Sequence, residues 1–236
     1  MTAIPLALIG MGRMGRALAE LAPDRGLAVV ARIDHDQPVT RDALGGAAVA
    51  IEFTVPGAAA SNVLACAGAG CPVVVGTTGW YDALPSVRAE VERRDTAMLY
   101  APNFSLGVAI FDRLVAEAAR LFAGAPGFEA HLVETHHAAK KDAPSGTAAA
   151  LARTAEQASG TAMPITSVRV GSVPGTHEMV FDAPFEQVRL VHEARDRRVF
   201  AEGALTAARW LLGRRGVFTM QDVLAAPAPT PHPVHS

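Results

Sequence analysis

The stretch Ile-Pro-Leu-Ala-Leu-Ile-Gly-Met-Gly-Arg-Met-Gly, at positions 4–15, decides the fold of this chain. The apolar run at its start is typical of a buried parallel strand, and an apolar-periodic helix is predicted over residues 16–21. Between them, Gly10 allows a tight turn, Gly12 a close approach of the backbone to a pyrophosphate, and Gly15 close packing of helix on strand. Strand, glycine turn and helix in this order predict a dinucleotide-binding unit.

The next apolar run supplies the context that a GxGxxG pattern needs, because the pattern alone is weak. It covers residues 27–33 and ends in Asp34, which is placed to bind the ribose hydroxyls of an adenosine. The other interpretation of Asp34 is a turn residue before Asp36 and Pro38. We favour the ribose contact, and expect NADH or NADPH as the cofactor.

Strands and helices continue to alternate to residue 104. Strands are predicted at 48–53, 73–75 and 97–100, with helices at 58–69 and 84–94. Each strand ends in a cluster of small or polar residues, at 54–57, 76–79 and 101–104. Ligands of open parallel sheets bind beyond the carboxyl ends of the strands, so these clusters and the glycine loop should line one crevice.

A different pattern follows Phe104. A long helix is predicted at 106–122, a strand at 129–135, a helix from Thr147 to Ser159, and strands at 166–170, 178–181 and 186–192 without helices between them. This indicates an inserted α+β domain with a mixed sheet. We therefore expect a Rossmann-like α/β domain of residues 1–104 and 199–236, which includes a helix at 199–212 and the segment 218–224, and a second domain of residues 105–198. The proline-rich residues 225–236 should be disordered.

The inserted domain carries the densest group of reactive side chains. Positions 134–148 read Glu-Thr-His-His-Ala-Ala-Lys-Lys-Asp-Ala-Pro-Ser-Gly-Thr-Ala. Ser145 is a good N-cap, and the first-turn backbone N–H groups behind it could hold a carboxylate or phosphate, with Lys140 or Lys141 folded over them. The plainer interpretation is a solvated loop before an ordinary capped helix.

Composition narrows the kind of partner. The formal net charge is −2, half of the 236 residues are hydrophobic and 19% are charged. This disfavours a nucleic acid or an anionic membrane as partner and favours a small molecule. The only two cysteines, Cys66 and Cys71, lie in apolar surroundings and should be reduced packing residues of a cytoplasmic protein. The sequence shows neither a signal peptide nor an apolar run of ~18 residues that could span a membrane.

Four motifs together resemble one family. They are Gly-Arg-Met-Gly at 12–15, Gly-Thr-Thr-Gly at 76–79, Ala-Pro-Asn-Phe-Ser at 101–105, and the stretch at 134–148. The chain resembles the 4-hydroxy-tetrahydrodipicolinate reductases, also called dihydrodipicolinate reductases, of lysine and diaminopimelate biosynthesis. The resemblance implies the two-domain fold above, a cyclic dicarboxylate imine as substrate, and a homotetramer assembled through the inserted domain.

The resemblance also implies roles for particular residues. His136 is expected to be the catalytic acid/base and Lys140 a proton donor. His137, Ser145, Gly146 and Thr147 are expected to bind substrate, one carboxylate of which would take the helix end. The nucleotide contacts would be Gly10, Met11, Gly12, Arg13, Met14, Gly15, Asp34, Gly76, Thr77, Thr78, Ala101, Pro102, Asn103 and Phe104.

Some alternatives stay open. The chain is short for the family, and His35 follows Asp34 where some members carry arginine, so the choice between NADH and NADPH is open. A related reductase of another small amino or imino acid is the second interpretation, and a dinucleotide-sensing subunit is disfavoured because it would not need His136 and Lys140. No metal is expected. A zinc site of His136, His137 and Asp142 is remote, since adjacent histidines point apart on a strand.

Overall fold

A computed structural model describes residues 2–225, and the chain divides into two compact units. The first unit contains the chain up to Ala101 and resumes at Ala204, while the second runs from Pro102 to Gly203. The two boundaries fall close to those expected at residues 104 and 198. The boundary between Gly203 and Ala204 lies inside a helix, because α6 (Arg198–Leu211) begins in the second unit and ends in the first.

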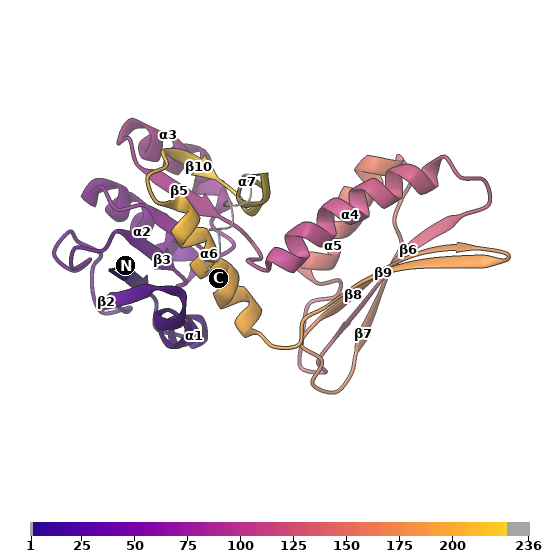
Figure 1. The fold of residues 1–236 in the computed structure, drawn as a ribbon, viewed down its shortest axis with the longest axis horizontal. Coiled ribbons are helices and arrows are strands. Elements are labelled where there is room, and N and C mark those ends of the chain that lie inside the picture. The colour runs from indigo at the N-terminus through magenta and orange to yellow at the C-terminus, as the bar shows by residue number, and fades with distance from the viewer. Residues whose placement is uncertain (1, 226–236) are drawn as a thin grey trace, which may run out of the picture. The chain divides into compact units, whose positions relative to one another are not determined.

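The first unit is a parallel α/β sheet, drawn in indigo, purple and yellow in Figure 1. Six strands, all paired in parallel, follow the order β10-β5-β4-β3-β1-β2. The strand order reverses between β1 and β3, which is where doubly wound sheets bind their ligands. The elements are β1 (Ile4–Ile9), α1 (Arg13–Leu21), η1 (Pro23–Arg25), β2 (Leu27–Ile33), β3 (Val49–Glu52), α2 (Pro56–Ala69), β4 (Val73–Val75), η2 (Tyr81–Ala83), α3 (Leu84–Arg93), β5 (Ala97–Tyr100), β10 (Gly216–Phe218) and α7 (Met220–Ala225).

Side chains on the two faces of this sheet alternate, and both faces are buried. Ala7 and Ile9 of β1 pack with α2 and α3, whereas Leu6 and Leu8 point to the opposite face and are fully buried as well. Cys66 packs in the α2 side of the core. Burial raises the pKa of both cysteine thiols, that of Cys71 to about 11, so both stay protonated. Both cysteines are buried and free in the structure, as expected of packing residues.

The second unit is a mixed sheet with helices on one face. It contains α4 (Leu106–Ala123), β6 (Glu129–His136), α5 (Gly146–Ser159), β7 (Ile165–Arg169), β8 (Thr176–Ala183) and β9 (Glu186–Glu193). The strand order is β7-β6-β8-β9, with β6 and β7 parallel and the other pairs antiparallel. Helix α5 provides the crossover that a parallel pair requires. Phe111, Leu151, Leu132 and Met179 represent the core that α4 and α5 form on the sheet.

The fold class is confirmed, with three local differences. Helix α1 begins at Arg13, so Gly15 lies inside it. The sixth strand, β10, is not predicted, because it is only three residues long and starts with Gly216 after two arginines. Ala225 ends α7, and residues 226–236 of the predicted tail lie outside the described part of the chain. Within the described residues, no helix is long and apolar enough to cross a membrane.

Candidate active site

The glycine loop after β1 is held closely by its neighbours at two of its three glycines. Gly10 has φ +92°, and a Cβ there would lie 2.1 Å from the carbonyl oxygen of Phe53. A Cβ at Gly15 would lie 2.1 Å from the carbonyl oxygen of Gly10, whereas a Cβ at Gly12 would meet no atom within 4 Å. Gly10 and Gly15 are therefore required by packing, while Gly12 keeps an open space clear beside the loop.

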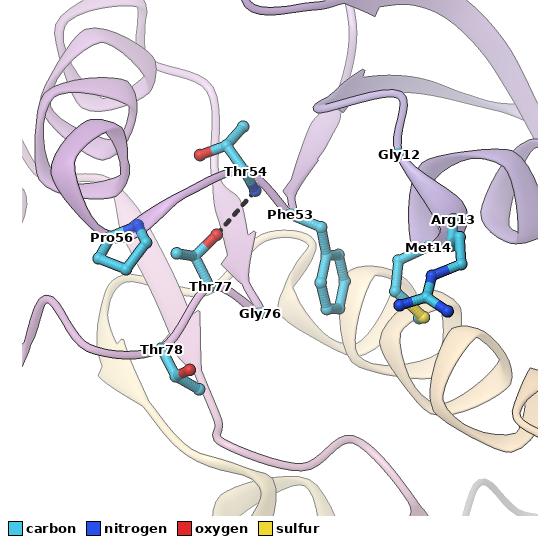
Figure 2. Close-up of a pocket in the computed structure, with 9 residues that line it drawn as sticks. All are labelled: Gly12, Arg13, Met14, Phe53, Thr54, Pro56, Gly76, Thr77 and Thr78. Atoms are coloured by element: carbon cyan, nitrogen blue, oxygen red, sulfur yellow. Dashed lines mark hydrogen bonds between the residues drawn. The ribbon is translucent and has the colours of Figure 1, made fainter. Parts of the chain in front are cut away.

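That open space belongs to a pocket of ≈350 Å³, whose lining is shown in Figure 2. Helix α1 begins there with Gly12 as its N-cap, which cannot supply a side chain to cap the first-turn N–H groups. These donors and the positive end of the helix favour an anion. The lining residues are Gly12, Arg13, Met14, Phe53, Thr54, Pro56, Gly76, Thr77 and Thr78.

Hydrogen bonds fix the loop that forms the other wall of the pocket. The Thr54 amide donates to Oγ1 of Thr77 over 2.7 Å, the bond dashed in Figure 2, and the buried Trp80 indole donates to the Thr77 carbonyl over 2.8 Å. Gly76 lies against the Phe53 ring, which leaves no room for a side chain there. The structure thus brings Gly12, Arg13, Met14, Gly76, Thr77 and Thr78 of the predicted cofactor residues to one pocket. Phe53, Thr54 and Pro56 were not among them, although residues 54–57 were expected to line the crevice.

Asp34 lies beside the glycine loop, as its position after β2 predicts. Its Oδ1 accepts from the backbone N–H of His35 at 3.0 Å and of Met11 at 3.4 Å. These two bonds lower the pKa of the Asp34 carboxyl, so it is ionised at neutral pH. The neighbouring His35 has Nε2 3.0 Å from a carboxylate oxygen of Asp36 and Nδ1 3.8 Å from Asp34. The loop end therefore carries negative charge, with the His35 ring between two carboxylates.

Residues 101–104 divide between the two units. Ala101 ends the first unit, while Pro102, Asn103 and Phe104 belong to the second. Within the second unit, Nδ2 of Asn103 donates to Oγ1 of Thr147 over 3.1 Å, and its Oδ1 accepts from the Ser105 amide over 2.8 Å. Asn103 is thus tied to the start of α5, where substrate binding is predicted.

The start of α5 has the geometry expected from the sequence. Ser145 is its N-cap, with φ −67° and ψ 155°, and its Oγ accepts from the Ala148 amide over 3.1 Å. Gly146 is exposed, and its first-turn N–H has no intrahelical partner by the geometry of helices. Lys140 pairs with Asp142, with Nζ 2.8 and 2.9 Å from the two carboxylate oxygens. The prediction of the Ser145 cap is confirmed.

Glu134, which is fully buried, connects this helix start to two strands. Its Oε1 accepts from the Ser145 amide at 3.1 Å, from Ser167 Oγ at 2.7 Å and from Arg169 Nη2 at 2.6 Å. Burial alone would raise the pKa of the Glu134 carboxyl, but the hydrogen bonds from Ser145, Ser167 and Arg169 outweigh burial together and lower the pKa to about 2. The carboxylate is therefore ionised.

Two buried histidines complete the cluster. Nδ1 of His136 lies 2.9 Å from Oε2 of Glu134, and the His136 and His177 rings meet edge to face with centroids 5.3 Å apart. Nε2 of His177 lies 3.4 Å from Oγ of Ser145. Burial lowers the pKa of both rings, and that of His177 reaches about 4. In both rings the Glu134 charge opposes the effect of burial.

The same cluster could be considered as a metal site. One ligand atom each of Glu134, His136 and His177 lies within 4.8 Å of the others. The Arg169 guanidinium, however, already neutralises the Glu134 carboxylate, and a divalent cation would stand beside a positive charge. Proton handling suits this arrangement better. His137, which follows the end of β6, is half-buried and is not part of the cluster.

Glu134, Arg169 and His177 were given no role by the sequence. Their link is the sheet register, in which Glu134 faces Ser167 and His177 on its two neighbouring strands, and His136 faces Arg169. To find these residues from the sequence, one would have to know how strands more than 30 residues apart align with each other.

Comparison with known proteins identifies the family of this chain. The model for the N-terminal part of dihydrodipicolinate reductases matches residues 4–104, and the model for the C-terminal part matches residues 107–224. A 4-hydroxy-tetrahydrodipicolinate reductase of Christiangramia forsetii is 36% identical over 234 residues, which cover 93% of this chain and 97% of the relative. One of Xanthomonas euvesicatoria pv. vesicatoria is 39% identical over 228 residues, covering 90% of this chain and 94% of the relative. The structure of a dipicolinate-bound dihydrodipicolinate reductase from Paenisporosarcina sp. TG-14 shares the fold with a TM-score of 0.80 at 20% identity, over 92% of this chain and 97% of that one. The chain belongs to the dihydrodipicolinate reductase family.

Proposed function

We propose that this chain reduces 4-hydroxy-tetrahydrodipicolinate to tetrahydrodipicolinate with NADH or NADPH, in lysine and diaminopimelate biosynthesis. Family membership over nearly the whole chain supports this reaction. The observation that carries the site assignment is the buried cluster in which the acid/base His136 and the anion-binding start of α5 share one carboxylate, Glu134.

The first unit would hold the dinucleotide, whose nicotinamide supplies the hydride. The residues fit this group, because the space at Gly12 is open and the uncapped start of α1 faces it. Asp34, ionised and exposed beside the loop, would accept from ribose hydroxyls. The nucleotide contacts proposed are Gly10, Met11, Gly12, Arg13, Met14, Gly15, Asp34, Gly76, Thr77, Thr78, Ala101, Pro102, Asn103 and Phe104.

The second unit would hold the substrate, a ring with two carboxylates. Ser145, Gly146 and Thr147 would receive one carboxylate at the start of α5, and His137 would contact the substrate as well. Loss of the 4-hydroxyl as water leaves a conjugated imine. After a hydride adds to its ring carbon, the electron pair of the conjugated system must take up a proton at carbon, and His136 would donate it. Lys140 would add positive charge near the second carboxylate and assist this proton supply.

We expect the working assembly to be a homotetramer joined through the sheet of the second unit. The helices cover only the face that carries Leu132 and Met179. The opposite face exposes Val168 on β7 and Val191 on β9. Partner subunits could bury these side chains, which is the usual reason for an apolar open sheet face.

The activity is tested by following nicotinamide oxidation, with the substrate generated in the cuvette from pyruvate and aspartate semialdehyde. Aspartate and other keto or imino acids should be offered in parallel, since these are the substrates of the second interpretation. We expect turnover only with the dicarboxylate imine. Preferential turnover of another imino or keto acid would overturn the assignment.

A further inference from the structure

We propose that Glu134 is the positioning residue of the reaction: its Oε2 holds the Nδ1–H of His136, so that Nε2 is the nitrogen that carries the transferred proton. With its Oε1, the same carboxylate fixes the start of α5 on the adjacent strands. This inference rests on the proposed function, in which His136 is the acid.

The two atoms lie within ion-pair distance of each other and are both buried. Oε2 of Glu134 and Nδ1 of His136 lie 2.9 Å apart as an ion pair, and neither atom makes a hydrogen bond among the described residues. Both atoms are buried, and a buried polar atom without a partner costs ~1–3 kcal/mol. A proton on Nδ1 would face the carboxylate oxygen at this distance, whereas a proton on Nε2 of a neutral ring would leave two lone pairs facing each other. The structure thus favours the Nδ1–H form.

The other carboxylate oxygen of Glu134, Oε1, fixes the side chain in place. It accepts three hydrogen bonds, from β7 through Ser167 and Arg169 and from the start of α5 through Ser145. Arg169 is itself held by the Asp142 carbonyl, to which Nη2 donates over 2.6 Å. A carboxylate fixed at one oxygen can hold a ring at the other. His136 and the substrate-binding helix start are consequently kept in one fixed relation.

The Nε2 side of the ring faces Gly175. A Cβ at Gly175 would lie only 3.0 Å from Nε2 of His136, so the glycine keeps that nitrogen uncovered. During turnover, Nε2 gives its proton to the ring carbon and keeps the lone pair, Nδ1–H stays on Glu134, and solvent then returns a proton to Nε2. The charged groups that act on the ring are Glu134 of β6, Lys140 and Asp142 of the following loop and Arg169 of β7, and the titratable ring of His177 of β8 also faces it.

The tautomer of His136 can be measured by NMR, without an activity assay. Long-range proton–nitrogen NMR of histidine rings, with His136 assigned from the signal missing in His136→Gln, should show Nδ1–H for neutral His136 in the full-length protein. In Glu134→Gln, whose amide N–H can point at Nδ1, the Nε2–H form should gain. Nε2–H in the native protein would overturn the proposal, even if Glu134→Gln failed to fold.

Kinetics provides the second readout. A general acid contributes ~10²–10⁴-fold, so Glu134→Gln should lower kcat by at least about tenfold and by no more than that range. Because Glu134 favours the protonated ring, the high-pH fall of kcat/KM should move to lower pH in the variant. An unchanged pH profile would contradict the inference, since loss of structural support alone would lower activity without moving the profile.

Two control variants distinguish the contact at Oε2 of Glu134 from the contacts at Oε1 and from the general effect of removing a negative charge. Ser167→Ala removes a bond to Oε1 but leaves Oε2 on His136, so the pH profile should keep its position. Glu178→Gln removes an equal charge from the same sheet, where Glu178 pairs with Arg189, and should also leave the profile in place. A native protein that fails to reduce the dicarboxylate imine would refute the proposed function, while the tautomer measurement would still decide the role of Glu134.

Discussion

Replacing Gly12 and Gly15 by alanine, one at a time, should separate cofactor binding from folding. Both belong to the same glycine motif, Gly12 as the N-cap of α1 and Gly15 inside this helix, and both receive the same methyl group. At Gly12 the methyl meets no atom within 4 Å and the φ of −65° suits any residue, whereas at Gly15 it would lie 2.1 Å from the Gly10 carbonyl oxygen. The two variants therefore test two different requirements of one motif.

For Gly12→Ala, the methyl occupies the space where a pyrophosphate would approach the start of α1. Loss of one hydrogen bond to a charged group removes ~1.5–3 kcal/mol, and ~1.4 kcal/mol is tenfold in affinity. The Kd for NADH should thus rise about 10- to 150-fold. Stability should change by less than about 1 kcal/mol, because the loss of a glycine N-cap and the lower entropy of the unfolded chain offset each other.

For Gly15→Ala, the backbone of the loop must move to accept the methyl group. Over-packing of this kind costs ~1–3 kcal/mol, only partly offset by the better helix propensity of alanine, ~1 kcal/mol. Trp80 and Trp210 both lie in the first unit, so their fluorescence reports its unfolding in urea. NADH fluorescence titration gives Kd for the folded variants. Wild-type Kd in a folded Gly12→Ala protein would refute the binding argument, and a wild-type urea midpoint in Gly15→Ala would refute the packing argument.

Further changes follow from the same structure. His136→Ala and Lys140→Ala should lower turnover, by ~10²–10⁴-fold for the histidine, and leave the Kd of the nucleotide nearly unchanged. Near-native turnover in both would mean that the stretch only binds substrate. The Asp34 carboxylate should repel a 2′-phosphate, so NADH should serve at least as well as NADPH. The ratio of kcat/KM with NADH to kcat/KM with NADPH tests this, and a strong NADPH preference would contradict it. Burial lowers the pKa of His177 to about 4. Below pH ~6.5 the unfolded chain therefore binds a proton that the folded chain does not bind, and the free energy of unfolding should fall as pH drops from ~6.5 towards 4. Urea midpoints that fall equally in native protein and His177→Gln would show that another group is responsible. Light scattering at micromolar concentration should show a tetramer, and a monomer would exclude assembly through the open sheet face.

The glycine loop could be predicted because its determinants are local. Strand β1, the turn at Gly10 and helix α1 follow one another within 18 residues, and each imposes its own pattern on the sequence. The Ser145 cap is likewise read from four consecutive residues. Strand β10 could not be predicted in this way. It pairs with β5, which lies more than 110 residues earlier, and its three residues have no periodicity of their own.

The buried cluster of the second unit could not be predicted from the sequence, because it depends on the register between strands. Leu132, Glu134 and His136 alternate along β6 and point to one face, which changes from apolar to ionisable toward the end of the strand. The helix-covered core needs Leu132 opposite Met179 on β8, and this alignment places Glu134 opposite His177. A slip of one residue would move the whole set to the other face. The apolar half of the strand thus determines where the proposed acid/base His136 and the Glu134 carboxylate lie, so a substitution that loosened Leu132 should impair turnover before it unfolded the protein.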